Sequence, residues 1–426
     1  MMHRNTNNKQ STKQASGAEV RSALTARADG NGKKETRSPL FPLPPRSAEL
    51  LALIAVTVCG IAARWMLFPL SSWDLEHYLI PWYETIRDNG GFRAVGMDIG
   101  DYAPTYRYFL AFLTTFRIPA VAGIKVFSGI FELIGAVYIM RIAKLVSPDP
   151  ARPMLAYTAA FCLPTVMLNS AAWGQCDGIY TCFLIISLYE LLRERDARAM
   201  IMFGLAFSFK LQAIFFAPFV LVMILRGRIR IRSALLAPAV FVVSVLPAAA
   251  AGGSFFSLLT VYARQSAQYG TLDMALPNLW TLIKDGESME LGGAGVFGAG
   301  AAMLAYVWYG QRHTGKTDKT ELICAALVSC MAVPFFLPYM HERYFFTAEV
   351  LLILAAVCRP ERLWMPAAAQ FCGIITVSGY LFDKPRPDMR LLTLIEAAVL
   401  CALCLMWSRS MKTAGTQEQT PKEVIP

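Results

Sequence analysis

The sequence predicts an all-α, polytopic helical membrane protein with about twelve transmembrane helices. Three observations support this fold class: 55% of the 426 residues are apolar and only 16% are charged, the apolar residues form long blocks, and basic residues gather between the blocks. A soluble domain usually carries about 25% charged and about 45–50% apolar residues. The composition therefore excludes a soluble enzyme. The unbroken blocks exclude a porin-like barrel, whose strands alternate over about 10 residues each.

The chain begins with a basic polar segment, residues 1–46, which holds nine Lys or Arg residues against three acids. It is rich in Ser, Thr, Asn and Gly and has no aromatic residue before Phe41, a composition typical of disordered segments. We interpret it as a cytoplasmic tail on the positive-inside side of the first span, next to membrane lipid. A basic tail without interleaved aromatic residues does not indicate a nucleic-acid partner.

The transmembrane domain is predicted to cover residues 47–409, and residues 410–426 form a second cytoplasmic tail. A hydrocarbon core of ~30 Å requires about 20 apolar residues per helix. One apolar stretch, residues 103–116, is shorter than this and contains an Arg, so we interpret it as an interfacial helix in the first outer loop. The predicted spans are 48–70, 119–146, 152–169, 178–193, 197–210, 212–226, 233–250, 291–310, 321–337, 343–358, 363–381 and 390–408.

The distribution of basic residues sets the predicted topology. With the N-terminus in the cytoplasm and residues 103–116 not crossing, every inner loop carries at least two basic residues, and four arginines lie within residues 226–232. If residues 103–116 crossed the membrane, these clusters would face outward, against the positive-inside rule. The rule therefore predicts twelve spans with both termini inside, and it places the polar turns on the outer face.

An acidic segment directly follows the first span. On a helix, Asp74 shares a face with His77 and Tyr78, whereas Glu76 points the opposite way. A carboxylate held against Trp73 at the membrane interface would have its pKa raised by desolvation, which suits a general base. A helix N-cap with interfacial Trp and Tyr anchors is the alternative.

Two further polar turns are predicted on the outer face. The first precedes the interfacial helix, where an N-cap role for its acid is favoured over catalysis. The second lies between two spans and combines Trp, Gln, Asp and Tyr, which can shape a sugar site because carbohydrates stack on aromatic rings and hydrogen-bond to amides and acids. Interfacial anchoring with a helix capped at its acid is the alternative for this turn. The residues of the two turns are Asp101, Tyr102, Trp173, Gln175, Asp177 and Tyr180.

Cationic residues mark two more outer turns. Lys210 lies between two half-length helices, an arrangement that marks binding sites in membrane proteins; snorkelling to the headgroups is the alternative. His341 and Arg343 lie between apolar spans on a predicted helical start, and Arg343 offers a bidentate fork for phosphate. A structural Glu342–Arg343 pair is the alternative.

Glu132, midway along the second span, requires a partner that the sequence does not identify.

The predicted topology brings these acids and cations to one side of the membrane. A base for a hydroxyl nucleophile, together with cations for an anionic lipid leaving group, is the arrangement that glycosyl transfer from a polyprenyl phosphate requires. Phosphate is a good leaving group, so electrostatic stabilisation by Lys and Arg can replace a metal.

Taken in order, four motifs resemble the GT-C superfamily of membrane glycosyltransferases. Residues 74–76 (DLE) resemble its modified DxD motif, and residues 173–177 (WGQCD) are similar to the WGQxD segment of bacterial proteins related to GPI-anchor mannosyltransferases. Residues 209–213 (FKLQA) and 341–343 (HER) resemble the FKQ and HEK segments of the dolichyl-phosphate-glucose-dependent glucosyltransferases. The HEK lysine is Arg343 here, which preserves the charge.

The resemblance implies a GT-C-like fold, a polyprenyl-phosphate-linked sugar donor and inversion at the anomeric carbon, with Asp74 as the catalytic base. It implies a hexose of mannose or glucose type, a lipid-linked or cell-envelope glycan acceptor, and an active site on the outer (periplasmic) side of a bacterial inner (plasma) membrane. Lys210, His341 and Arg343 would bind the donor phosphate. No cofactor is certain, and Asp74 with Glu76 is the candidate site for a divalent cation, Mg²⁺ or Mn²⁺. The residues expected to bind sugar or acceptor are Glu76, His77, Asp101, Tyr102, Trp173, Gln175, Asp177, Tyr180, Gln212 and Glu342.

A transporter or flippase of lipid-linked sugars is the alternative function, suggested by the twelve spans and the interrupted pair within residues 197–226. Transporters usually show internal repeats, and the two halves of this sequence show none. Their ionisable residues should also lie near the midplane of the membrane rather than at one surface. A non-catalytic scaffold would leave the four polar motifs unexplained.

Overall fold

The computed structural model divides the chain into two units, residues 1–51 and 52–426, and the fold described below is that of the second unit. Of the predicted basic tail, residues 1–44 lie outside the described residues. The structure describes residues 45–266, 271–283, 289–312, 318–385 and 387–417.

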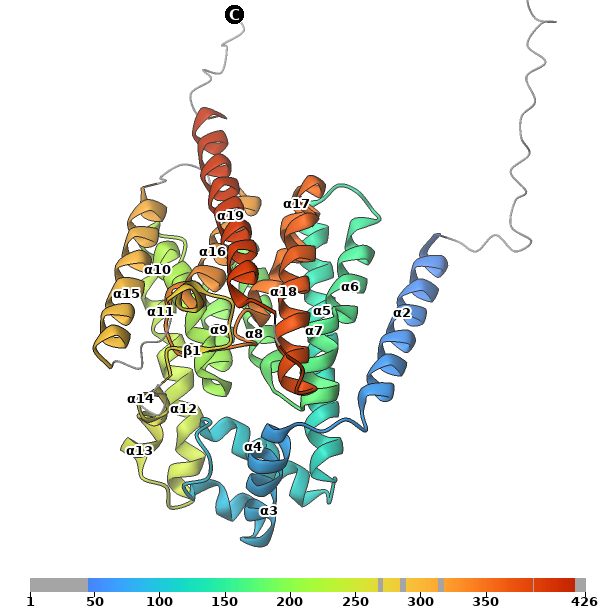
Figure 1. Ribbon diagram of the computed structural model, residues 1–426, viewed down its shortest axis with the longest axis vertical. Coiled ribbons are helices and arrows are strands. Elements are labelled where there is room, and N and C mark those ends of the chain that lie inside the picture. The colour runs from blue at the N-terminus through green and yellow to red at the C-terminus, as the bar shows by residue number, and fades with distance from the viewer. Residues whose placement is uncertain (1–44, 267–270, 284–288, 313–317, 386, 418–426) are drawn as a thin grey trace, which may run out of the picture. The chain divides into compact units, whose positions relative to one another are not determined.

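The regular structure is almost entirely helical (Figure 1). The α-helices are α2 (Pro45–Leu67), α3 (Ile80–Asp88), α4 (Pro104–Thr115), α5 (Ala120–Val146), α6 (Arg152–Cys162), α7 (Pro164–Met167), α8 (Asp177–Leu192), α9 (Asp196–Phe209), α10 (Ala217–Leu225), α11 (Ile231–Ala234), α12 (Leu236–Ala250), α13 (Phe255–Leu259), α14 (Val261–Ser266), α15 (Met289–Gln311), α16 (Lys319–Phe336), α17 (Phe346–Cys358), α18 (Trp364–Leu381) and α19 (Met389–Gln417). The other elements are the π-helical turns η1 (Leu75–Leu79) and η3 (Leu168–Trp173), the 3₁₀ turns η2 (Gly91–Gly96), η4 (Leu211–Phe216), η5 (Leu279–Leu282) and η6 (Pro360–Arg362), and the two-residue strands β1 (Asp273–Met274) and β2 (Met340–His341).

Helices occupy all twelve predicted apolar blocks, and the chain is an all-α, multi-pass membrane protein. Among the described residues, six helices are long and apolar enough to span a membrane, and the pair α6 and α7, bent by 42°, raises the number to seven. The predicted count of twelve spans is therefore not confirmed. In the remaining blocks several helices are too short to be counted as spans, for example α8 with 16 residues and α9 with 14. At the C-terminal end, α19 continues to Gln417, beyond the boundary predicted at residue 409.

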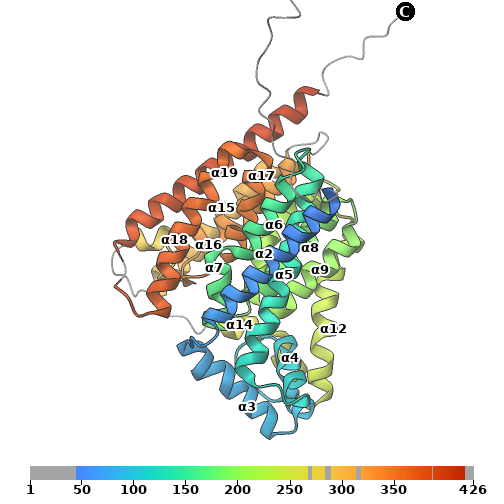
Figure 2. The same ribbon diagram turned by 90° about the vertical axis from the view of Figure 1, so that its right-hand side faces the viewer.

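The predicted interfacial helix forms as α4, which is 12 residues long and too short to span. Both views show it beside α3 at one end of α5 and α12 (Figures 1 and 2). Its Arg107 is buried and donates hydrogen bonds to the carbonyls of Val95, at 3.2 Å, and of Met97. The cation in this apolar stretch therefore fixes the loop that precedes the helix.

The buried Glu132 of α5 pairs with Arg64 of α2. The Arg64 Nη2 and Nε atoms lie 2.7 and 2.9 Å from Glu132 Oε2, and Ser170 Oγ donates to the same oxygen at 2.8 Å. Arg64 also donates to the carbonyl of Phe161 at 2.9 Å. Because both charges are buried, this pair joins α2 to α5 and α6 and supplies the partner that the sequence could not identify.

A short parallel pairing of β1 with β2 sets the position of His341. Asp273 pairs with Met340 and Met274 with His341. Next to this pairing, the Asn278 side chain donates to the carbonyls of Pro334 and Leu337, at 3.1 and 3.0 Å, where α16 ends. The unpaired carbonyls of a helix C-terminus are thereby satisfied, and the turn that carries His341 is fixed on both sides.

Candidate active site

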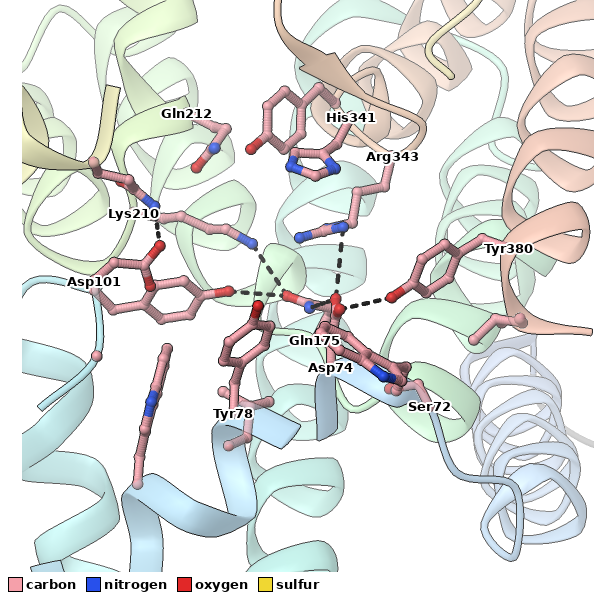
Figure 3. Close-up of a pocket in the computed structure, with 18 of the residues that line it drawn as sticks. Ser72, Asp74, Tyr78, Asp101, Gln175, Lys210, Gln212, His341, Arg343 and Tyr380 are labelled. Carbon is pink, nitrogen blue, oxygen red and sulfur yellow. Dashed lines mark hydrogen bonds and ion pairs between the residues drawn. The ribbon is translucent and has the colours of Figure 1, made fainter. Parts of the chain in front are cut away.

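A cavity of about 910 Å³ lies where the predicted polar turns meet (Figure 3). It is lined by residues from the first loop, the turn before α8, the break between α9 and η4, the β2 turn and the end of α18. Of the fourteen residues proposed from the sequence for catalysis or binding, eight line it: Asp74, Asp101, Tyr102, Gln175, Lys210, Gln212, His341 and Arg343. The other six lie behind this lining or away from it: Glu76, His77, Trp173, Asp177, Tyr180 and Glu342.

Asp74 is held at one end of the cavity by three hydrogen-bond donors. Its Oδ1 accepts from the Tyr380 hydroxyl at 2.7 Å, and its Oδ2 accepts from Gln175 Nε2 at 2.7 Å and from Trp173 Nε1 at 3.0 Å. Ser72 Oγ donates to the carbonyl of Trp173 at 2.7 Å, which ties the first loop to the turn before α8. The carboxylate is thus fixed by groups from α18 and from that turn (Figure 3).

The prediction that the pKa of Asp74 is raised is wrong. Burial raises it, but the Arg343 guanidinium, 3.8 Å away, and the three hydrogen bonds together bring the pKa below its ordinary value of 3.8. The indole beside the carboxylate is that of Trp173, which donates a hydrogen bond, whereas Trp73 is more than half exposed and stacks on His77. Asp74 is consequently an ionised carboxylate in the free protein.

The predicted face shared by Asp74, His77 and Tyr78 forms only in part. Tyr78 lines the cavity, but the His77 ring hydrogen-bonds to the carbonyl of Trp73 at 3.0 Å and points elsewhere. The reason is that residues 75–79 form a π-helical turn, whose i→i+5 bonding alters the spacing of an α-helix. Glu76 and His77 are exposed, and neither of them lines the cavity.

Lys210 enters the site as half of a buried ion pair. Its Nζ lies 2.6 Å from Asp177 Oδ1 and 3.3 Å from Gln175 Oε1, and the Lys210 and Asp177 side chains are only 2% and 1% exposed. The alternative of a snorkelling Lys210 is wrong, because its side chain is buried and pairs with Asp177 inside the protein. The alternative of an N-cap at Asp177 is also wrong, because Cys176 is the N-cap of α8.

Arg343 connects three carboxylates. Its Nε lies 3.3 Å from Asp177 Oδ2, and its Nη1 lies 3.2 Å from Glu342 Oε1 and 3.8 Å from Asp74 Oδ2. Its guanidinium carbon also lies 4.9 Å from the centre of the Trp173 ring. Burial lowers the pKa of Arg343, but the surrounding carboxylates outweigh burial and raise it well above its ordinary value. The structural Glu342–Arg343 pair therefore exists, together with contacts that reach the cavity.

His341 lines the cavity from β2 rather than from a helical start, because α17 begins only at Phe346. Its ring contacts Tyr344 edge-to-face at 5.3 Å, and its Nδ1 lies 3.7 Å from Glu342 Oε2. Glu342 is buried behind the lining, so the structure does not place its side chain where it would contact a sugar in the cavity.

Asp101 and Tyr102 line the opposite side of the cavity. The N-cap role predicted for Asp101 is wrong, because Ala103 is the N-cap of α4 and makes no side-chain cap. Asp101 Oδ2 instead accepts a hydrogen bond from Gln265 Nε2 at 3.3 Å, and the Tyr102 hydroxyl donates to Gln175 Oε1 at 3.2 Å. Burial raises the pKa of Asp101 above its ordinary value, in contrast to Asp74.

Two aromatic residues proposed as sugar platforms are buried. Trp173 is fully buried, and its ring stacks on Tyr380 at 4.6 Å between centres. Tyr180 is buried within α8 and does not line the cavity. The aromatic rings that do line it include Tyr78 and Trp82, from the first loop and α3.

The sequence analysis did not identify Tyr380 or Gln265 as site residues. Tyr380 lies at the end of an apolar helix, where an interfacial anchor is the ordinary interpretation of a Tyr. Gln265 lies in the short helix α14 and belongs to none of the four motifs.

Of the two residues of the candidate metal site, Asp74 lines the cavity, whereas Glu76 is exposed on η1 and does not line it. Across the described ranges, no three His, Cys, Asp or Glu side chains form a group that could hold a metal ion. The mechanism proposed below uses only the side chains that line the cavity or support its lining.

Two comparisons bear on the identity of the chain. The family model described as Glycosyltransferase family 87 matches residues 101–334, more than half of the sequence. The search of curated proteins found no match to this sequence. The matched range begins at Asp101, includes Gln175, Lys210 and Gln212, and ends shortly before the β2 turn.

Proposed function

The chain belongs to glycosyltransferase family 87 and is a membrane glycosyltransferase; we propose that it moves a hexose of mannose or glucose type from a polyprenyl-phosphate donor to a lipid-linked or cell-envelope glycan. The observation that carries this proposal is the position of Asp74. Its carboxylate is ionised, fixed by three donors, and shares one cavity with Lys210, His341 and Arg343. A fixed base facing cationic groups suits attack by a hydroxyl on a sugar phosphate.

The cavity presents its cations, and two of the acids that pair with them lie behind the lining, whereas Asp74, the third acid beside Arg343, lines the cavity. Lys210 and Arg343 line the cavity, whereas Asp177 and Glu342, which pair with them, do not. The buried acids therefore orient the cations without covering them. A donor phosphate would meet Lys210, Arg343 and the His341 ring, which stabilise the negative charge of the leaving group.

In the proposed reaction, the oxygen of an acceptor hydroxyl attacks the anomeric carbon of the donor. The bond between that carbon and the phosphate oxygen breaks, polyprenyl phosphate leaves with the electron pair, and the hydroxyl proton passes to Asp74. Attack opposite the leaving group inverts the anomeric configuration. Since phosphate leaves readily, the base is required only as the new glycosidic bond forms.

We place this reaction on the outer face of a bacterial inner membrane. In support, the turn before α8 and the β2 turn, which the predicted topology assigns to that face, contribute Gln175 and His341 to the same cavity. The four arginines within residues 226–232 lie on a different set of loops, around α11. Both termini are then cytoplasmic.

The test uses cells from which the gene has been deleted and to which either the unmodified gene or the Asp74→Asn variant has been returned. Envelope glycans and polyprenyl-phosphate sugars of the two strains are compared by mass spectrometry. We expect Asp74→Asn to lower transfer by about 10²–10⁴-fold, the range for loss of a general base, and the unused donor to accumulate. Asp98→Asn is the matched control, because Asp98 is 74% exposed, pairs with Arg264 at 3.4 Å and does not line the cavity.

Full transfer by Asp74→Asn at normal protein level would refute the assignment of the base. If the unmodified protein moved a lipid-linked sugar across vesicles and formed no new glycosidic bond, the transporter function would replace the proposal.

A further inference from the structure

Two buried glutamines on the far side of the cavity have unused hydrogen-bonding capacity. Gln212 and Gln265 are each 4% exposed, and both line the cavity. Within the described residues, neither amide oxygen has a hydrogen-bond partner. Buried polar atoms are nearly always paired in native proteins, so two unpaired acceptors on residues that line one cavity make these residues candidates for binding a ligand that donates hydrogen bonds.

The orientation of one of these amides is fixed by Asp101. Gln265 Nε2 donates to Asp101 Oδ2 at 3.3 Å, so the amide nitrogen points to the carboxylate and the oxygen is left for another partner. Gln212 follows Lys210 at the start of η4, where the chain leaves α9. Figure 3 shows Gln212 and Asp101 on the Lys210 side of the cavity, away from Tyr380.

Aromatic rings stand beside these acceptors. Trp82 and Tyr102 line the cavity and contact each other edge-to-face at 5.2 Å between ring centres. Gly100, which has a φ of +64°, lies against the Trp82 ring, and a Cβ there would clash with it. The turn that carries Asp101 therefore requires glycine at this position, both for its left-handed backbone and for the close approach of the ring.

We propose that Asp101, Gln212 and Gln265 form a subsite for the hydroxyl groups of a pyranose ring, with Trp82 and Tyr102 as its aromatic walls. Sugar hydroxyls donate hydrogen bonds to carboxylate and amide oxygens, and the C–H face of the ring packs on aromatic side chains. A phosphate oxygen cannot hydrogen-bond to these carboxylate and amide oxygens, because all of them are acceptors, and of the two glutamines only Gln212 has an amide nitrogen for which the structure shows no partner among the described residues. This inference rests on the proposed function, since the ring belongs either to the donor hexose or to the acceptor glycan.

Binding of free sugars tests the subsite without any turnover. The probes are methyl α-D-mannopyranoside and methyl α-D-glucopyranoside, titrated by saturation-transfer NMR into the full chain in nanodiscs, and sugar-free polyprenyl phosphate as a third ligand. We expect Gln212→Leu and Gln265→Leu each to weaken pyranoside binding by tenfold or more and to leave polyprenyl phosphate binding unchanged.

Gln370→Leu is the matched control, because Gln370 is a buried glutamine of α18 outside the cavity, bonded to Thr165 Oγ1 at 2.7 Å and to Glu349 Oε2 at 3.0 Å. It should bind pyranosides normally but melt at a lower temperature. Gln212→Leu, which removes an unpaired oxygen, should keep the melting temperature.

Unchanged pyranoside affinity in both cavity variants, or no pyranoside binding to the unmodified protein, would overturn the subsite. A parallel loss of polyprenyl phosphate binding would instead assign the glutamines to the phosphate and also overturn it. Where the subsite holds, a raised KM for the donor assigns the ring to the donor hexose, and a raised KM for the acceptor assigns it to the acceptor. These readouts are independent of Asp74→Asn, so either proposal can fail alone.

Discussion

The two ends of the cavity differ in how their polar atoms are satisfied. At the Asp74 end, both carboxylate oxygens accept hydrogen bonds, and Arg343 stands close by. At the opposite end, Gln212 and Gln265 present amide oxygens without partners among the described residues. The Asp74 carboxylate is fully bonded before a substrate arrives, whereas the two amide oxygens are not.

This difference separates two kinds of task. A group that takes part in the chemistry is useful when its position is fixed in advance, because no reorganisation is then needed during the reaction. A group that recognises a substrate must keep its hydrogen-bonding capacity free until the substrate binds. The hydrogen bonds of the free protein thus distinguish a catalytic end from a recognition end in one cavity.

Lys210 lies between the two ends, and its substitution should have the largest effect. Lys210→Met would leave Asp177 a buried carboxylate whose remaining cationic partner, within the part of the chain that the structure describes, is Arg343. Breaking a buried pair from one side destabilises a protein by about 3–5 kcal/mol. We expect a large fall in melting temperature, measured by thermal scanning in detergent, and loss of transfer.

The double variant Lys210→Met/Asp177→Asn separates stability from function. It removes both charges, so the melting temperature should recover while transfer stays low, because the phosphate has lost a cation. Recovery of transfer in the double variant would show that Lys210 only balances the charge of Asp177. Lys210 would then have no role in binding the donor phosphate between the two ends of the cavity.

A smaller effect on transfer is expected from Tyr380→Phe at the Asp74 end of the cavity. The substitution removes the hydroxyl that donates to Asp74 and keeps the ring that stacks on Trp173. Since the hydrogen bond lowers the pKa of Asp74, its loss raises that pKa. On acidification, Asp74 is then protonated at a higher pH than in the unmodified protein, and the ionised base disappears at that higher pH.

The measurement is the pH profile of kcat/KM, whose acid limb should move to higher pH in Tyr380→Phe, with kcat about tenfold lower. A merely structural tyrosine would lower the amount of active protein and leave the limb in place. That outcome would remove Tyr380 from the positioning of Asp74.

Local pattern was enough to predict much of this arrangement. The apolar blocks predicted the helices, and the break at Lys210 predicted a site because a buried Lys in an interrupted helix needs a partner. Asp74, Gln175 and Arg343 were proposed from separate motifs, and the structure brings them to one cavity.

Long-range contacts were not predictable in the same way. The low pKa of Asp74 depends first on Arg343 and then on Tyr380, which is 306 positions away from Asp74 and lies at the end of an apolar helix. The partner of Glu132 is Arg64, which lies in a different predicted span. No local periodicity contains such pairings, because they depend on which helices pack together.

The smallest effect concerns Asp101 at the opposite end of the cavity. Its pKa is raised by burial, so it stays protonated to a higher pH than an ordinary Asp, and it becomes a full acceptor for sugar hydroxyls only once ionised. Pyranoside affinity should therefore rise a few-fold with pH across this titration and then level off, measured as Kd from NMR titrations.

In Asp101→Asn, which has no such proton, the affinity should not change with pH, whereas Asp98→Asn should follow the unmodified protein. If Asp101→Asn kept the rise, another group would control recognition at this end, and the distinction between a catalytic carboxylate and a recognition carboxylate would no longer hold.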